Sequence, residues 1–117
     1  MNAMLLVIKN MNWNNISTIQ NVVDASFQKP CFIFKHSNRC GISFSAKDEM
    51  EKLSALDAVF YMVDVVAERP LSHQIAAFFS VKHESPQVLI LHQGKLMHHA
   101  SHSAIRSTKI ETIFSQL

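Results

Sequence analysis

The chain has 117 residues, of which 48% are hydrophobic, a length and composition that suit one compact domain with a full apolar core and argue against two domains. The formal net charge is only +2, and the basic residues are scattered along the sequence. This pattern argues against nucleic acid or an anionic membrane surface as a partner.

Membrane insertion and secretion also find no support in the sequence. No apolar run approaches the roughly 20 residues that cross a bilayer, and the apolar stretch at residues 4–8 follows no basic residue, unlike a secretory signal. We therefore expect a soluble protein of the cytoplasm. The two cysteines, Cys31 and Cys40, are too few for a disulfide scaffold, and in a reducing compartment a lone exposed cysteine is more often catalytic or redox-active.

The first part of the chain predicts a helix followed by a buried strand. Ser17-Thr18-Ile19-Gln20 has the pattern of a capping box, and apolar residues follow at near-helical spacing, which predicts a helix over about Thr18–Ser26. Pro30 separates this helix from a strand at Cys31–Lys35. The strand begins with four apolar residues, so both of its faces are expected to be covered by helices in the middle of a sheet.

A second helix is predicted after the loop that contains Cys40. Its charged residues face water, and its apolar residues form one stripe, which consists of Ile42, Ala46, Met50 and Leu53. Another strand is predicted at Ala58–Val63. The strand–helix–strand order predicts a right-handed crossover that joins two parallel strands.

The next part of the chain predicts a short helix and a β-hairpin. Pro70 and Ser72 open the helix, which ends near Val81 and has an apolar face of Ile75, Phe78 and Phe79. Gln87–His92 and Lys95–Ala100 are strand-like runs. Only Gln93-Gly94 lies between them, which is the spacing of a hairpin.

A terminal helix completes the predicted order. Thr108-Lys109-Ile110-Glu111 forms a second capping box, and the apolar stripe that follows consists of Ile110, Ile113, Phe114 and Leu117. A βαβ unit, a helix, a hairpin and a closing helix predict an α/β domain, with a central mixed sheet and helices on both faces. This is the thioredoxin-like arrangement, in which the reactive cysteine lies where the first crossover helix begins. Cys40 has that position.

The surroundings of Cys40 indicate thiol–disulfide exchange. Backbone N–H groups in the first turn of a helix lack intrahelical partners and lie at the positive end of the macrodipole, so they favour a thiolate over a thiol. Arg39 adds a positive charge, Gly41 belongs to the same first turn, and Ser43 Oγ is expected to hydrogen-bond the thiolate from one turn on. A serine cannot attack a disulfide, so Cys40 is expected to act without a second sulfur.

Several sequence blocks, in order, carry a family resemblance. They are Phe34-Lys35-His36-Ser37-Asn38-Arg39-Cys40-Gly41-Ile42-Ser43, Glu68-Arg69-Pro70, Val81-Lys82-His83-Glu84-Ser85-Pro86-Gln87 and Ser101-His102. Together they are far more specific than a bare Cys-x-x-Ser. From about Met11 to its end, the chain resembles the monothiol bacilliredoxin family of the bacillithiol system.

The resemblance implies a bacterial thiol–disulfide oxidoreductase with a thioredoxin-like fold. It would remove bacillithiol, or a related small thiol, from mixed disulfides on proteins through Cys40. The implied partners are S-thiolated proteins, the small thiol as co-substrate, and a second thiol or another redoxin that releases it. No bound cofactor and no metal are implied.

The resemblance also implies substrate-binding residues. Ser85-Pro86 is expected to face Cys40 with a cis peptide bond and to pair with an extended substrate through backbone groups. Ser101 and His102 are expected to hold polar parts of the small thiol, although helix capping and loop solvation explain the same residues equally well. Arg39 could pair with carboxylates of that acidic thiol.

The chain departs from the family at two places. Members often have tryptophan after Ser-His, where this chain has Ser103. About ten residues precede Met11-Asn12-Trp13, the ordinary start of the family. We therefore divide the chain into an extra segment at residues 1–10, which is either an edge strand or the result of a misplaced start codon, and one thioredoxin-like domain at residues 11–117.

Two other functions stay open at this point. The fold could bind a partner at Ser85-Pro86 without redox turnover, and the reactivity of Cys40 distinguishes this alternative. A metal-binding protein is the other, because four histidines cluster in and after the hairpin, namely His92, His98, His99 and His102. Adjacent strand residues point to opposite faces, which argues against one shared metal site.

Three further residues are not assigned a role in the chemistry. Cys31 lies inside an apolar strand, where a cysteine usually behaves as a small hydrophobe, so we expect it to be inert. His36 and His83 belong to the family blocks and could tune the charge of Cys40. Flanking a loop is also an ordinary position for a polar residue, so neither histidine is assigned a role.

Overall fold

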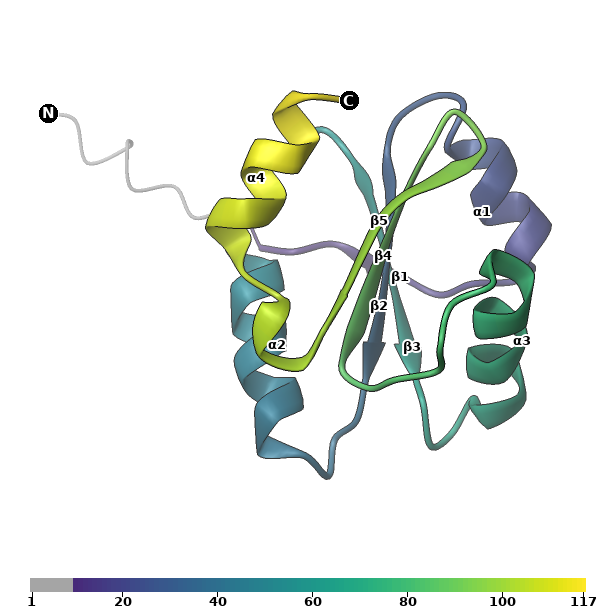
Figure 1. The fold of residues 1–117 in the computed structure, drawn as a ribbon, viewed down its shortest axis with the longest axis vertical. Helices are drawn as coiled ribbons and strands as arrows, with labels where there is room; N and C mark the ends of the chain where they lie inside the picture. The colour runs from purple at the N-terminus through teal and green to yellow at the C-terminus, as the bar shows by residue number, and fades with distance from the viewer. Residues whose placement is uncertain (1–9) are drawn as a thin grey trace, which may run out of the picture.

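The computed structural model describes residues 10–117, which form a mixed sheet covered by helices on both faces (Figure 1). The elements are β1 (Trp13–Asn14), α1 (Ile19–Ala25), β2 (Cys31–His36), α2 (Gly41–Glu51), β3 (Val59–Asp64), α3 (Arg69–Phe79), β4 (Gln87–His92), β5 (Lys95–Ser101), the 3-10 helix η2 (His102–Ala104) and α4 (Ser107–Ser115). The strand order is β1-β3-β2-β4-β5. β3 is parallel to β1 and β2, whereas β4 is antiparallel to β2 and β5. The predicted α/β architecture is confirmed.

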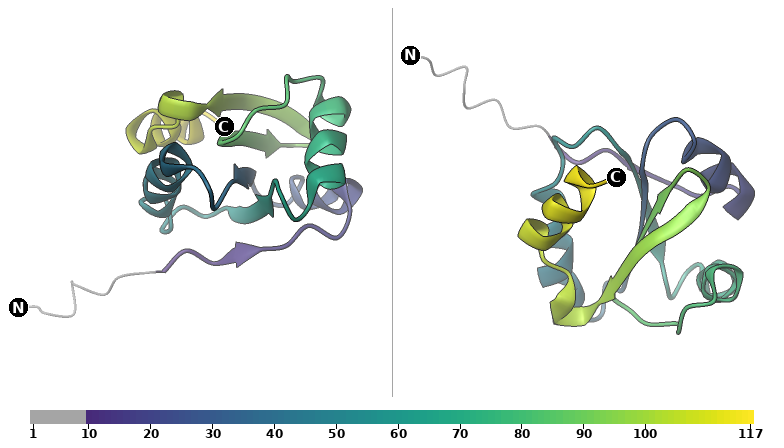
Figure 2. Two further views of the ribbon diagram at one scale, coloured as in Figure 1. Left: turned by 90° about the horizontal axis from the view of Figure 1, so that it is seen from below. Right: turned by 45° about the horizontal axis from the view of Figure 1, so that its top comes forward.

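The alternation of side chains along β2 divides the core into two layers. Phe32 and Phe34 face α2 and α4, where they pack with residues such as Met50 and Ile110. Cys31 and Ile33 face the opposite layer, which contains apolar residues of α1 and α3. Both views of Figure 2 show the two helix pairs on opposite sides of the sheet. β2 is buried along its whole length, as predicted for the central strand.

β1 is an element that the sequence did not predict. It has only two residues, and Trp13 pairs with Phe60 while Asn14 pairs with Tyr61. Two residues are too few to show a hydrophobic period, so pairing with β3 decides the conformation of this segment. The Trp13 ring also stacks on Phe34, with 5.7 Å between ring centroids. The edge strand considered for residues 4–8 lies outside the described residues.

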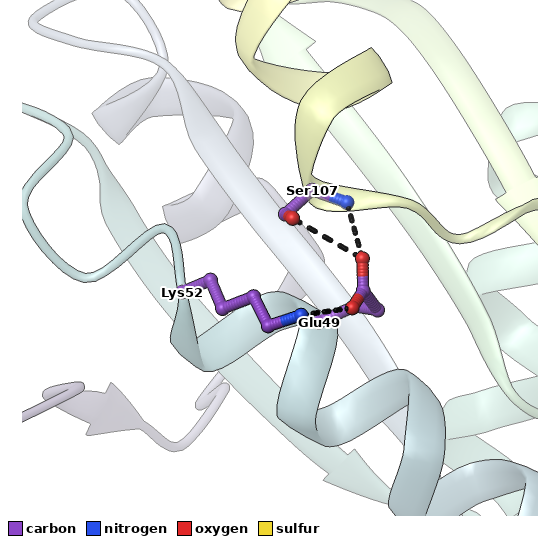
Figure 3. A network of polar contacts seen from close by, with 3 residues as sticks. All are labelled: Glu49, Lys52 and Ser107. Carbon is purple, nitrogen blue, oxygen red and sulfur yellow. Dashed lines mark hydrogen bonds and ion pairs between the residues drawn. The ribbon is translucent and has the colours of Figure 1, made fainter.

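Both predicted capping boxes are misplaced, the first by one residue and the second by two. Thr18, not Ser17, is the N-cap of α1, and its Oγ1 accepts a hydrogen bond from the Asn21 N–H at 3.1 Å. α4 begins at Ser107 rather than after Thr108. A distant carboxylate replaces a local cap there, since Glu49 Oε1 on α2 accepts hydrogen bonds from Ser107 N at 2.8 Å and Ser107 Oγ at 3.1 Å (Figure 3).

The predicted hairpin is confirmed, and a contact with α1 fixes its turn. Gln93 and Gly94 both have positive φ, of 53° and 77°, as in the type I′ turn that suits two-residue hairpins. Ser26 accepts hydrogen bonds from both turn residues, through its carbonyl from Gln93 N and through Oγ from Gly94 N, each at 2.9 Å. Because the Phe27 ring covers Gly94, a side chain at position 94 would collide with it.

Two residues of the predicted apolar stripes lie on the surface. Ile42 on α2 is 55% exposed, and Phe78 on α3 is 53% exposed. The buried positions of α2 are Ser43, Ala46 and Met50, so the inner face begins with a serine rather than with Ile42. Helical spacing identified the correct helices but placed their inner faces slightly wrongly.

Candidate active site

The candidate site lies at one edge of the sheet, where four connections meet. β2 and β3 are parallel, so the segments that follow them leave from the same edge. β4 is antiparallel to β2 and starts there, and β5 ends there. Figure 1 shows these connections together at the lower end of the molecule. The topology therefore brings together three segments that are far apart in the sequence, namely residues 37–40, 85–86 and 101–102.

Cys40 is the N-cap of α2. Its backbone is extended, and its carbonyl accepts hydrogen bonds from Ser43 N at 3.1 Å and Phe44 N at 3.3 Å, which starts the helix at this residue. Cys40 is a free, partly exposed cysteine. No helix N–H donates to its side chain within the described structure. Cys40 therefore lies partly exposed at the positive end of α2, the position that the sequence predicted.

Arg39 and Gly41 flank the sulfur and are both exposed. A Cβ placed on Gly41 would meet no atom within 4 Å, so the approach to Cys40 is open on this side. Hydrogen bonds from Ala67 N and Val66 N are the main cause that lowers the pKa of Asp64, and the positive charge of Arg39 lowers it further. The Arg39 guanidinium thus interacts electrostatically with Asp64 at the end of β3.

The expectation that Ser43 supports the thiolate directly is wrong. Ser43 is fully buried, and its Oγ accepts a hydrogen bond from Ser37 N at 2.9 Å and bonds His36 Nδ1 at 2.6 Å. Cys40 is the N-cap and has an extended backbone, so the helical spacing that would align it with Ser43 does not apply, and Ser43 bonds the end of β2 instead. Ser43 therefore holds together the two ends of the segment that carries Cys40.

His36 is the partner that the sequence left without a role. It is 4% exposed, its ring stacks on Phe34 with 5.7 Å between centroids, and Phe44 packs edge-on at 5.1 Å. Burial is the main cause that lowers its pKa, so the imidazole is neutral at neutral pH. Because Ser43 Oγ already accepts from Ser37 N, it can donate its own proton to the neutral ring.

The Ser85–Pro86 peptide bond is cis. Gln87, which follows it, starts β4 and pairs with Lys35 near the end of β2, so Pro86 and the segment that carries Cys40 lie at the same edge. Ser85 Oγ is buried and has no hydrogen-bond partner within the described residues. A free hydroxyl therefore stands directly before the proline.

Ser101 and His102 reach this edge in different ways. Ser101 pairs with Gln87, and its Oγ accepts a hydrogen bond from Gln87 Nε2 at 3.4 Å, so this hydroxyl faces the neighbouring strand. His102 has a positive φ of 55°, and its N–H donates to the Pro86 carbonyl at 3.0 Å. This bond ties the start of η2 to the cis proline and leaves the His102 ring exposed.

A buried lysine supports the same edge from the opposite layer. Lys35 is fully buried, and its Nζ donates to the Ser72 carbonyl on α3 at 2.9 Å. Ser72 Oγ bonds His83 Nε2 at 2.8 Å, and the His83 ring stacks on His73 at 4.1 Å. Burial lowers the pKa of Lys35 to about 8. In the sequence, Lys35 stands out as a lysine inside an apolar strand. That position does not reveal that Ser72 is its hydrogen-bond partner.

Cys31 and the hairpin histidines form no second reactive centre. Cys31 is fully buried, as predicted, and burial is the main cause that raises its pKa to about 11. Among residues 10–117, no group of three or more His, Cys, Asp or Glu side chains could hold a metal ion.

Within the same range, no helix is long and apolar enough to cross a membrane.

Known proteins share this fold. A family model described as monothiol bacilliredoxin BrxC matches residues 11–110. A solved structure assigned as an oxidoreductase with a thioredoxin fold is 33% identical, with a TM-score of 0.75, and the match covers 85% of this chain and 90% of that chain. Thioredoxin from Malassezia sympodialis matches with a TM-score of 0.69 and 18% identity over 94% of both chains. An N21Q mutant thioredoxin from Halobacterium salinarum matches with a TM-score of 0.70 and 12% identity, over 94% of this chain and 93% of that chain.

These similarities and the geometry define a thiol redox protein with the thioredoxin fold. The two thioredoxins share the fold at low identity, and the family match adds the redox function and the single-thiol class. The chain belongs to the monothiol bacilliredoxin family.

Proposed function

We propose that this protein removes bacillithiol, or a related small thiol, from mixed disulfides on other proteins, with Cys40 as the attacking thiol. The observation that carries this proposal is one accessible thiol at the N-cap of α2, on the same sheet edge as the cis Ser85–Pro86 bond. The buried Ser43 stands where a Cys-x-x-Cys site would have its second sulfur.

The first step forms one disulfide and breaks another. The Cys40 thiolate attacks the sulfur of the small thiol, and the sulfur of the substrate protein leaves as a thiolate that takes a proton from water. The small thiol is now joined to Cys40 by a disulfide bond. The number of disulfides is unchanged, so this step needs no external oxidant or reductant.

The second step needs a thiol from outside the chain. Cys31 lies fully buried on the layer of α1 and α3, and its raised pKa of about 11 keeps it protonated. A second small thiol or another redoxin therefore attacks the mixed disulfide and releases the Cys40 thiolate. The attacking thiol becomes disulfide-bonded to the small thiol in its place.

The surrounding groups have separate roles in this proposal. Arg39 supplies a positive charge next to Cys40 in the sequence, Gly41 leaves the start of α2 open, and Ser43 acts indirectly by fixing the segment that carries Cys40. Backbone groups of Ser85 beside Pro86 pair with an extended segment of the substrate protein. The exposed His102 ring, with Ser101 behind it, faces the small thiol.

The proposed setting is the bacterial cytoplasm. A reducing thiol pool there supplies the second thiol and keeps unmodified cysteines reduced. No cofactor is needed, because the small thiol itself is the co-substrate and both steps are exchanges between sulfur atoms.

The proposal is tested with a substrate protein that carries one bacillithiol on a single cysteine. Catalytic amounts of the protein, with free bacillithiol present, should remove the modification faster than bacillithiol alone. The Cys40→Ser variant should give only the background rate, and the Cys31→Ser variant should retain activity. Equal rates for the wild type and Cys40→Ser would refute the proposed function.

A further inference from the structure

A hollow of about 400 Å³ lies between α2 and the segment formed by η2 and the start of α4. We call it the α2–η2 hollow. Its volume is within the range of about 300–1,000 Å³ that is typical of small-molecule sites. One wall is made by Ile42, Ala46 and Ile105, so part of its surface is apolar.

The hollow begins on the same helix that carries the reactive thiol. Cys40 is the N-cap of α2, and Ile42 lies two residues further on in the first turn. Ile42 is 55% exposed, so about half of this apolar residue is open to solvent. A partly open apolar residue of the hollow therefore lies within one helical turn of the residue to which the small thiol would be bonded.

Basic and hydroxyl groups line the other side. The hollow contains Arg106 and His102, together with the hydroxyl-bearing side chains of Ser45 and Ser103. None of the ion pairs found within residues 10–117 involves Arg106, which is exposed. Its guanidinium is available for a carboxylate, with which arginine forms charge-assisted and often bidentate hydrogen bonds.

The acidic residue in the hollow does not compete for Arg106. Glu49 Oε1 accepts two hydrogen bonds from Ser107, and Oε2 forms an ion pair with Lys52 Nζ at 2.6 Å (Figure 3). These contacts lower the pKa of Glu49 to about 2. The Glu49 charge is therefore already satisfied, and Arg106 is left as the cation in the hollow that can receive an anion.

We propose that the α2–η2 hollow holds the non-reacting part of the small thiol while its sulfur is bonded to Cys40, and that Arg106 binds a carboxylate of this molecule. This inference rests on the proposed function and names the class of thiol that the site selects, namely one that carries a carboxylate. Ile42 contacts the carbon chain next to the sulfur, and Ser45 and Ser103 offer hydrogen bonds to hydroxyl groups.

The test compares two disulfides that differ only in charge. The probes are bacillithiol disulfide and the same disulfide with its carboxylates esterified, and the rate at which each forms a mixed disulfide on Cys40 is measured by intact mass. Arg106→Gln should slow the reaction of the charged probe about tenfold, as expected for the loss of a charge-assisted contact, and change that of the ester less than twofold. The control is Lys109→Gln, which removes the same charge from α4 one turn beyond Arg106 and outside the hollow.

The outcomes separate this inference from the proposed function. Equal effects of Arg106→Gln on both probes, or an equal loss in Lys109→Gln, would overturn the hollow as a carboxylate site while thiol exchange stands. A wild-type protein that forms no adduct with either probe would instead refute the exchange activity itself.

Discussion

At the scale of single residues, Cys40 and Cys31 carry the same thiol in different surroundings. Cys31 is fully buried in β2, and its pKa is raised to about 11, mainly by burial. Cys40 stands partly exposed at the N-cap of α2. The sequence was sufficient to distinguish the two, because a continuous apolar strand predicts burial and a strand–helix junction predicts access.

Alkylation of the native protein checks this distinction. Iodoacetamide at pH 7 should modify Cys40 in the folded protein and leave Cys31 unmodified, because only a thiolate that solvent reaches will react. Peptide mapping by mass spectrometry after a time course gives the two rates. In urea both cysteines should react, which serves as the control, and native labelling of Cys31 at the rate of Cys40 would contradict the assignment.

Ser43 shows where residue-level prediction failed. Its spacing from Cys40 predicted a hydrogen bond to the sulfur, whereas its Oγ bonds His36 and Ser37. The spacing fixes a shared helix but not which neighbour a buried hydroxyl meets, and the partner here is supplied by the end of β2.

Removal of the Ser43 hydroxyl should therefore lower stability. Ser43→Ala leaves the partly buried Ser37 N and the buried His36 Nδ1 without this partner, which is expected to cost about 1–3 kcal/mol in the free energy of unfolding. Urea denaturation measures the loss. Ser45→Ala, an exposed change on the same helix, should stay within about 0.5 kcal/mol. Equal stabilities of the two variants would show that the Ser43 bonds contribute nothing.

At the scale of elements, the sequence predicted which helices and strands exist, and their order, better than it predicted the residues at which they begin and end. Helices and strands with a clear period were found from the sequence, and the Gln93-Gly94 pair identified the hairpin. β1 was missed, because its two residues are a strand only through pairing with β3. The start of α4 was misplaced, because its cap is supplied by Glu49 on α2, 58 residues earlier.

The contact between Glu49 and α4 should stabilise the fold in a pH-dependent way. Several hydrogen bonds, with that from Lys52 the largest cause, lower the Glu49 pKa from 4.5 to about 2. A carboxylate with a lowered pKa stabilises the folded state above the unfolded value, and this stability is lost as pH falls from about 4.5 to about 2.

Glu49→Gln isolates this charge. The variant should be less stable than the wild type by about 1 kcal/mol at pH 7, the usual scale of helix-cap and helix-dipole contacts. Urea titrations should show the difference shrinking between pH 4.5 and pH 3, because Glu49 becomes protonated in the unfolded wild type over this range while the folded state keeps it ionised. Glu111→Gln on α4 provides the control, and a difference that does not change with pH would contradict the assignment.

At the scale of the whole molecule, the order of elements predicted the mixed sheet and placed Cys40 and Ser85–Pro86 at one edge. The side-chain contacts that stabilise this edge from the layer of α1 and α3 could not be predicted in the same way. Lys35 and Ser72 are 37 positions apart, and His83 joins them only when α3 packs on the sheet. Contacts between residues this far apart produce no regular spacing in the sequence from which they could be predicted.

Lys35 should reduce the stability of the domain at neutral pH. Its ammonium group is buried without an ion pair among the described residues, and burial lowers its pKa from 10.5 to about 8. The folded state therefore binds this proton more weakly than the unfolded state, and the cost is largest below about pH 8. It declines as pH rises toward 10.5.

Lys35→Met tests this account. The variant should be more stable than the wild type at pH 7, by about 1–4 kcal/mol, the range found when apolar residues replace buried ion pairs. Urea midpoints at pH 7 and pH 10 should show the gain becoming smaller at the higher pH. The exposed change Lys82→Met is the control, and a variant that loses stability at pH 7 would show that the Ser72 contact outweighs burial.

The central claim is that Cys40 carries the small thiol alone until an external thiol removes it. The most direct measurement is tandem mass spectrometry of the protein after a single reaction with bacillithiol disulfide and removal of free thiols. The account predicts one bacillithiol on Cys40 that persists over time and leaves only when a thiol is added. Loss of the adduct without added thiol, together with a Cys31–Cys40 disulfide, would contradict it.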